Sequence, residues 1–318
     1  MSGGEPPGPR DIGTEPQRQT SGQSAGNYGL LIFLGLVWGS AFMFTKLAVV
    51  TIPPITLTAG RAWIGSLMML AVAALLRPSL PRGHRVWLAL AAMGFTGSVL
   101  PLSLIAWGQA RIDSGLAAIL IGTVPLVTVV MAHFATRDDR LSWRKLAGTV
   151  LGLVGLVLLI GPAALTGLGD GLWRQLAVFG GACSFAVTIF LARSVRDVSP
   201  AVSSAVVLGI AAVMASVLGF AVEQSRWMAP TTASLLAVLA LGILSTGAGN
   251  LAFYRLSRTA PPSFVSLNNY LIPAVALMWG AMLLDEPITL RAGGALALIL
   301  AGVAIAGIKR RSVERKSP

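Results

Sequence analysis

The sequence contains little charge and almost no cysteine. Asp, Glu, Lys and Arg make up 11% of its 318 residues, and only 12 residues are acidic. Soluble domains carry about a quarter charged residues, so an ordinary soluble globular fold is excluded. The single cysteine, Cys183, excludes an intramolecular disulfide and a cysteine-type metal site.

Hydrophobic residues are abundant, at 55% of the chain with a mean hydropathy of +0.77. The net charge is +12, which alone would suggest a nucleic-acid partner. Such a partner needs basic residues gathered on one soluble face, whereas here they are dispersed among short loops. The composition therefore predicts a polytopic membrane protein in contact with the lipid bilayer, with no nucleic-acid partner.

Ten apolar runs are each about as long as a membrane span, and a helix of about 20 residues crosses a 30 Å hydrocarbon core. Barrel strands would need only about ten alternating residues. The expected fold is therefore an all-α integral membrane protein with ten transmembrane helices. The predicted spans are residues 28–50, 55–76, 86–107, 114–135, 146–160, 173–191, 201–222, 233–254, 263–284 and 292–308.

The distribution of basic residues predicts the orientation. With a cytoplasmic N-terminus, 18 of the 24 Lys and Arg residues fall in cytoplasmic segments and four in external ones. Residues 1–27, rich in Gly, Pro, Ser and Gln, are expected to be a disordered cytoplasmic tail. Residues 309–318 are expected to be a basic cytoplasmic tail. We therefore expect a multi-pass protein of the inner cell membrane with both termini in the cytoplasm.

The chain also reads as one five-helix unit written twice, over residues 28–161 and 171–308. Two apolar hairpins lie 147 or 148 positions apart, so that Pro125 falls opposite Pro273 and Gly155 opposite Gly302. Five spans per unit is an odd number, so the second unit enters the membrane from the opposite side. Inverted repeats of this kind are the usual plan of secondary transporters, with the substrate between the halves.

Several motifs, in this order and spacing, carry a family resemblance. They are Trp38-Gly39-Ser40-Ala41-Phe42, Lys46, Arg61, Gly122-Thr123-Val124-Pro125 and Leu284-Asp285-Glu286-Pro287. Over about residues 28–308 the chain resembles the drug/metabolite transporter superfamily, specifically its EamA-type members. The resemblance implies ten helices in two inverted five-helix repeats, and transport of small organic metabolites, often export of amino acids or related compounds.

Two cations fall within predicted spans, Lys46 late in the first and Arg61 early in the second. Intramembrane cations are costly and usually face a cavity or a partner. One interpretation is a cationic ledge that binds an anionic group of the substrate. The other is snorkelling to the outer surface, or a structural pair with Asp113, Asp285 or Glu286.

Four polar residues lie near the cytoplasmic ends of the eighth and ninth spans: Asn250, Asn268, Asn269 and Tyr270. Amides in hydrocarbon need hydrogen-bond partners. Successive helix positions point about 100° apart, so three in a row cannot all face one neighbouring helix. A cavity wall with substrate contact is therefore favoured over helix packing alone.

Trp38 and Thr123 are further mid-span candidates for substrate contact. The indole of Trp38 could stack on a substrate or pack internally, and the Thr123 hydroxyl could simply bond back to its own helix. Pro125 and Pro273 occupy equivalent mid-span positions and bend their helices, which suits hinges as well as static kinks.

Glycine pairs spaced four apart, Gly35 with Gly39 and Gly148 with Gly152, fit either close intramolecular packing or a weak homodimer. A monomer or weak homodimer is expected.

The rival function is an integral-membrane transferase acting on lipid or prenyl substrates. That chemistry normally needs clustered carboxylates, and the internal pair Asp138 and Asp139 is flanked by Arg137 and Arg140. We therefore expect no enzyme activity, cofactor or metal, and a small-molecule substrate.

Overall fold

The computed structural model describes residues 25–76, 80–135, 143–160, 170–195, 197–223, 229–260, 262–265 and 267–307. Every regular element in these ranges is helical, which confirms the all-α prediction for this part of the chain. The predicted tails lie outside the described residues, except for residues 25–27 at the start of the first helix. Residues 136–142, with Asp138 and Asp139, lie outside them as well.

The first half of the chain forms α1 (Ala25–Ala48), α2 (Pro54–Leu76), the continuous α3 (His84–Gly94), η1 (Phe95–Val99) and α4 (Leu100–Gln109), then α5 (Ser114–Ile121), α6 (Val124–Ala135) and α7 (Trp143–Ile160). The second half forms α9 (Asp170–Leu191), η2 (Ala192–Val195), α10 (Pro200–Val222), the continuous α11 (Thr232–Ala240), η4 (Leu241–Ala248) and α12 (Gly249–Thr259), then α13 (Pro262–Val265), α14 (Asn268–Leu283) and α15 (Leu290–Gly307). In the described ranges, seven helical stretches are long and apolar enough to cross a membrane. Three further apolar helices are shorter, at Lys145–Leu159, Leu271–Leu283 and Leu290–Ile305.

The third long stretch of each half contains a π-helical turn, η1 in the first and η4 in the second. In each turn a backbone N–H reaches five residues back: Leu100 donates to Phe95 O, and Gly249 to Leu244 O. π-Helical turns are rare and occur often at functional sites. The two turns begin 146 positions apart, close to the offset that relates the predicted halves.

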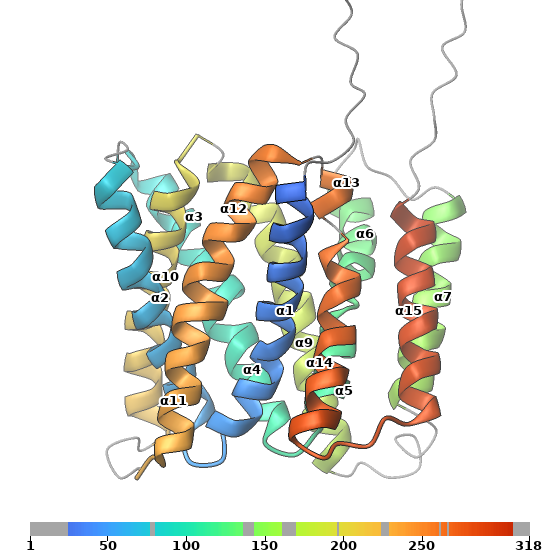
Figure 1. Cartoon of the computed structure of the whole chain (residues 1–318). Coiled ribbons are helices and arrows are strands. Elements are labelled where there is room, and N and C mark those ends of the chain that lie inside the picture. The colour runs from blue at the N-terminus through green and yellow to red at the C-terminus, as the bar shows by residue number, and fades with distance from the viewer. Residues whose placement is uncertain are drawn as a thin grey trace, which may run out of the picture.

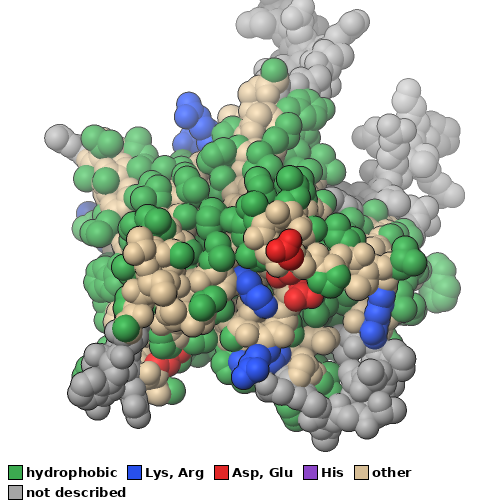
Figure 2. Space-filling model, turned by 60° about the horizontal axis from the view of Figure 1, so that its bottom comes forward, with side chains coloured by type: hydrophobic (Ala, Val, Ile, Leu, Met, Phe, Trp, Pro, Cys, Tyr) green, Lys and Arg blue, Asp and Glu red, His purple; other side chains and the backbone are tan. Residues whose placement is uncertain are grey.

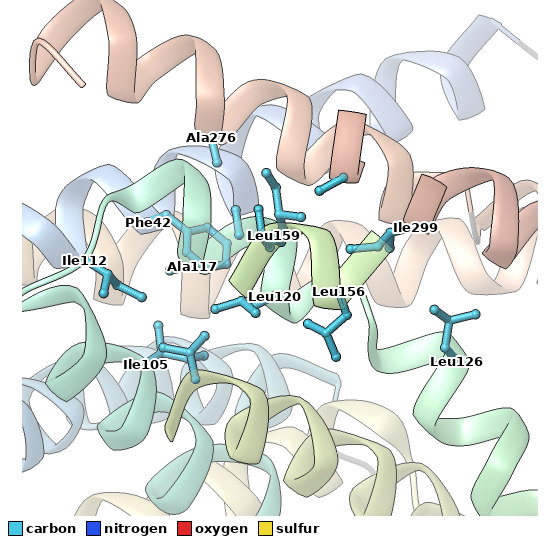
Figure 3. Packing of buried hydrophobic residues seen from close by; sticks show 14 residues of the cluster. Phe42, Ile105, Ile112, Ala117, Leu120, Leu126, Leu156, Leu159, Ala276 and Ile299 are labelled. Carbon is cyan, nitrogen blue, oxygen red and sulfur yellow. The ribbon is translucent and has the colours of Figure 1, made fainter. Parts of the chain in front are cut away.

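The two halves interleave rather than forming separate domains. α2 packs on α10, α4 on α9, α1 on α14 and α7 on α15, so each pair takes one helix from each half. α1 runs through the middle of the bundle, and the α7–α15 pair stands at one side (Figure 1). The largest buried cluster joins both halves, with Phe42 and Leu120 from the first and Ile299 from the second (Figure 3).

The helices begin on two opposite faces of the bundle. α1 begins on one face, and α2, α5 and α9 begin on the other, at the bottom of Figure 1. We call this second face the carboxylate face because Glu223 and Glu286 lie on it. The first helices of the two halves, α1 and α9, therefore run in opposite directions.

The paired glycines are used inside the molecule. A Cβ atom at Gly302 of α15 would lie 2.5 Å from Gly148 O and 2.7 Å from Gly152 N of α7, so these two helices meet backbone to backbone. Gly35 and Gly39 of α1 lie against α14, where an added Cβ would be 2.7 Å from Leu271 Cβ and 2.6 Å from Val275 Cβ. Of the two interpretations of this spacing, intramolecular packing is the one that these contacts display.

Candidate functional site

The π-helical turn of η4 organises a polar cluster within the bundle. Because Gly249 N bonds to Leu244 O, the carbonyl of Ser245 loses its usual partner four residues ahead. Thr246 turns its hydroxyl back to Leu241 O at 3.0 Å, and only 5% of Thr246 is exposed. The turn thus places the Ser245 carbonyl, without its helical partner, and the buried hydroxyls of Ser245 and Thr246 beside α1 and α2.

Arg61 of α2 reaches this turn from the other half of the chain. Its Nε donates to Thr246 Oγ1 at 3.2 Å and its Nη2 to Ser245 Oγ at 3.1 Å. Only 9% of the residue is exposed. Within the described part of the chain, both of these side-chain partners are neutral, and no carboxylate forms a salt bridge with the guanidinium. Arg61 is therefore a buried cation solvated by hydroxyls.

Trp38 of α1 closes the cluster on another side. Its indole Nε1 donates to the freed carbonyl of Ser245 at 3.1 Å, and its ring lies 5.5 Å from that of Phe253. A Cβ atom at Gly249 would lie 2.5 Å from Nε1, so only glycine leaves room for the indole there. The internal hydrogen bond expected in one of the two interpretations of Trp38 is present, and the indole remains half-buried.

Asn250 joins the same cluster from the start of α12. Its Nδ2 donates to Thr246 O at 2.5 Å, and the side chain is half-buried. Three of the predicted site residues, Trp38, Arg61 and Asn250, are therefore gathered around Ser245 and Thr246.

Lys46 lies apart from this cluster, at the end of α1 near the carboxylate face. Its Nζ donates to Ile112 O at 2.6 Å, and one turn earlier Phe42 O accepts a hydrogen bond from the fully buried Gln109 at 2.8 Å. The charge of Lys46 also affects the pKa of the Asp113 carboxyl. Burial and the nearby charge of Glu286 raise the pKa of the Asp113 carboxyl, and Lys46 opposes that rise. Lys46 and Arg61 thus have separate surroundings.

The helix break that precedes Pro125 lies close to Pro273. The helix breaks at Gly122 and Thr123, before α6 begins at Val124, and a Cβ atom at Gly122 would lie 3.5 Å from Pro273 Cγ. Thr123 is buried and its hydroxyl bonds back to Leu120 O at 2.6 Å, as one interpretation expected. α14 continues through Pro273.

The predicted polar trio opens α14. Asn268 is buried, with 3% exposed, and its Oδ1 has no hydrogen-bond partner in the described part of the chain. Asn269 is half-buried. Tyr270 belongs to the same helix, but its side chain lies outside the described residues. A buried amide oxygen without a hydrogen bond destabilises the fold unless another donor reaches it.

A cavity of about 270 Å³ opens on the carboxylate face, lined among others by Asp113, Gln175, Glu286 and Arg291. Acidic and basic side chains gather near the middle of this face (Figure 2). None of the predicted site residues lines this cavity.

Three residues of this cluster were not among the predicted site residues: Ser245, Thr246 and Gly249. Their one visible signal is a run of small and hydroxyl residues, Ser245-Thr246-Gly247-Ala248-Gly249, directly before Asn250 in a span that is otherwise aliphatic. Such residues mark close helix approach as often as a site. Their pairing with Arg61, 184 and 185 positions away, depends on the fold.

Comparison with known proteins gives the family. The model of the EamA-like transporter family matches the chain twice, over residues 27–161 and 172–308. The chain belongs to this family. The two matches follow the duplication expected from the hairpins, and family membership makes this a transmembrane transport protein.

Curated relatives are similar over nearly their full length. An uncharacterized transporter of Bacillus subtilis strain 168, YoaV, is 25% identical over 86% of this chain and 94% of its own. The uncharacterized inner membrane transporter YedA of Escherichia coli strain K12 is 24% identical, covering 87% and 89%. A protein of Streptantibioticus cattleyicolor named a probable terminal-alkyne amino-acid exporter is 27% identical, covering 90% and 94%. One crystal structure shares the fold with a TM-score of 0.65 at 22% identity, covering 89% of this chain and 99% of that one.

The matched family and the relatives reported above are named as transporters or exporters. Within the described residues, no three His, Cys, Asp or Glu side chains are arranged to hold a metal ion.

Proposed function

We propose that this EamA family protein is an alternating-access carrier with ten membrane crossings in two inverted five-helix repeats. The opposite directions of α1 and α9 support this arrangement, as does a π-helical turn in the third helix of each half. Basic residues concentrated in alternate loops support cytoplasmic N- and C-termini in the inner cell membrane.

The substrate site of this proposal is the cluster around η4, with Arg61 at its centre. The observation that carries it is an arginine, only 9% exposed, whose guanidinium donates to two neutral hydroxyls. A buried cation is stable when an anion pairs with it, and arginine suits a carboxylate because two of its N–H groups can bond both oxygens. A substrate carboxylate would supply that anion.

The remaining residues take supporting roles. Trp38 would present its ring to the apolar part of the substrate, and Asn250 and the unpaired Asn268 oxygen would bind its polar groups. Asn269, Tyr270 and Thr123 would line the path, Lys46 would attract anions near the carboxylate face, and Pro125 with Pro273 would act as hinges.

The favoured substrates are amino acids or related carboxylates, and the favoured direction is export. The relative named a probable terminal-alkyne amino-acid exporter supports both.

Counterflow in proteoliposomes tests the proposal. Vesicles loaded with an unlabelled amino acid would exchange it for the radiolabelled form, across a panel of amino acids. For each active compound, the matched amide and the decarboxylated amine serve as competitors. We expect competition from the acid and little from the other two. Equal competition by the amide would contradict recognition of the carboxylate.

A further inference from the structure

Glu286, in the hairpin between α14 and α15, binds the start of a helix in the other half. Its Oε1 accepts the Ser114 N–H at 2.8 Å, and its Oε2 accepts the Ser114 hydroxyl at 2.7 Å and the Gly115 N–H at 3.3 Å. Asp113 holds the cap position of α5, but its own side chain makes no capping bond. The negative carboxylate of Glu286 therefore satisfies the N-terminus of α5 in its place.

Glu223, at the end of α10, makes an equivalent contact at a second site. Its Oε1 accepts the Ile55 N–H at 2.7 Å, and its Oε2 accepts the Thr56 N–H at 2.8 Å and the Thr56 hydroxyl at 2.9 Å. These groups form the first turn of α2. Two glutamates of the second half thus cap two helices of the first half, each through two backbone N–H groups and one hydroxyl.

Both contacts lie on the carboxylate face, where α2 and α5 begin (Figure 1). The opposite face differs. There α10 and α14 begin with Ser199 and Leu267 in the cap positions, and neither side chain makes a capping hydrogen bond. The glutamate caps of the α2–α10 and α5–α14 pairs lie on the carboxylate face. The α2–α10 pair is joined further along by hydrogen bonds from Trp63 Nε1 to Ser216 Oγ at 3.1 Å and from Ser66 Oγ to Ala205 O at 3.2 Å.

Separating the halves on the carboxylate face would break both contacts together. Each loss would leave a carboxylate and several helix N–H groups without partners, and such charge-assisted bonds are among the stronger ones in proteins. Water entering the opened face would replace them in part, so the contacts can break and re-form during a cycle.

We propose that Glu223 and Glu286 are gating residues of the transport cycle, two carboxylate latches that hold this face closed and release together when it opens. The inference rests on the proposed alternating access, and its test needs no substrate.

Thiol labelling measures the opening directly. In a Cys183→Ser background, Ala118→Cys on α5 places a reporter about one turn from Ser114, and Ala215→Cys on α10 places one about two turns from Glu223. Both positions are 0% exposed. Each reporter is labelled separately with a membrane-impermeant maleimide, applied from either side of the vesicle membrane. We expect Glu286→Ala to raise the labelling rate of both reporters about tenfold from the carboxylate face.

The distant reporter distinguishes a gate from a frayed helix end. If Glu286→Ala raises labelling at Ala118→Cys and leaves Ala215→Cys unchanged, the contact is a local cap and the proposal fails. The matched control is Asp285→Asn, which removes a neighbouring exposed charge and keeps the cap. A rise as large in this control would equally overturn the proposal.

Two milder variants test the proposal if Glu286→Ala folds poorly. Ser114→Ala and Thr56→Ala each delete one hydroxyl donor and keep both carboxylates, so we expect rises of about threefold at both reporters. Unchanged rates in both would contradict the latches. Loss of the proposed carboxylate selectivity would leave these labelling results unaffected, so the two proposals fail separately.

Discussion

The two π-helical turns have the same backbone hydrogen bond but bring different side chains together. In η1, Leu100 N bonds to Phe95 O, which frees the carbonyl of Thr96, and Ser184 of α9 donates to it at 2.7 Å. In η4, the freed carbonyl of Ser245 accepts Trp38 of α1 at 3.1 Å. Each time, the first helix of one half donates a side-chain hydrogen bond into the third helix of the other.

The side chains around the two turns then diverge. Around η1 they are hydroxyls that satisfy one another, with Thr96 and Thr188 joined at 2.8 Å. Around η4 they include a cation, Arg61, whereas Ser184 and Thr188, which bond to η1, are neutral. The duplicated geometry supplies a freed carbonyl in both halves, and only one half adds a charge. We infer that η4 binds substrate and that η1 mainly holds helices together.

Replacement of Arg61 is the largest expected disruption of this contrast. Arg61→Gln keeps hydrogen-bond donors but removes the charge, so we expect counterflow of the carboxylate substrate to fall about a hundredfold. Arg61→Lys keeps the charge without the planar pair of donors and should retain intermediate activity. Equal activity of both variants and the unchanged protein, at matched amounts in the membrane, would contradict a binding role.

Much of the fold could be predicted from the sequence. In the described residues, helices cover most of every predicted apolar run, because a hydrophobic segment long enough to cross a bilayer has few alternatives to the helix. Residues 114–135 are interrupted at Gly122 and Thr123, and residues 263–284 are divided between α13 and α14. The helix ends differ more from the prediction. The eighth run continues as helix to Thr259, five residues beyond its predicted end, because α12 is polar on one side.

The contacts of the site were harder to predict. A π-helical turn changes neither the length nor the hydropathy of a span, so η1 and η4 leave no trace in the apolar pattern. Lys46 was expected to meet a substrate, the surface or a carboxylate, and its Nζ donates to a backbone carbonyl, Ile112 O. Every residue has such a carbonyl, so no sequence pattern identifies the one that is used. Glu223 and Glu286 bind the starts of helices in the other half, and that pairing required the fold.

Replacement of Trp38 is expected to have the next largest effect on transport. Trp38→Phe keeps an aromatic ring and deletes Nε1, which leaves the Ser245 carbonyl without its donor. We expect transport to fall about tenfold, and the folded state to lose about 1 kcal/mol. Gly249→Ala should resemble it, because the added Cβ would lie 2.5 Å from Nε1 and displace the indole. The control is Gly293→Ala on α15, where no atom lies within 4 Å of the added Cβ. Transport assays and thermal unfolding in detergent measure both effects.

The smallest effect is expected in η1, and it is the most direct test of the contrast. Ser184→Ala removes the donor to Thr96 O just as Trp38→Phe removes the donor to Ser245 O, so both leave one freed carbonyl unpaired. The free energy of unfolding should fall by a similar amount, about 1 kcal/mol, because each variant removes one hydrogen-bond donor from one carbonyl. Transport should nevertheless stay within about twofold of normal, since no cation or substrate group depends on η1 in this interpretation. If Ser184→Ala lost transport as strongly as Trp38→Phe at the same loss of stability, both π-helical turns would serve the substrate. The site would then lie between the two halves symmetrically, rather than around Arg61.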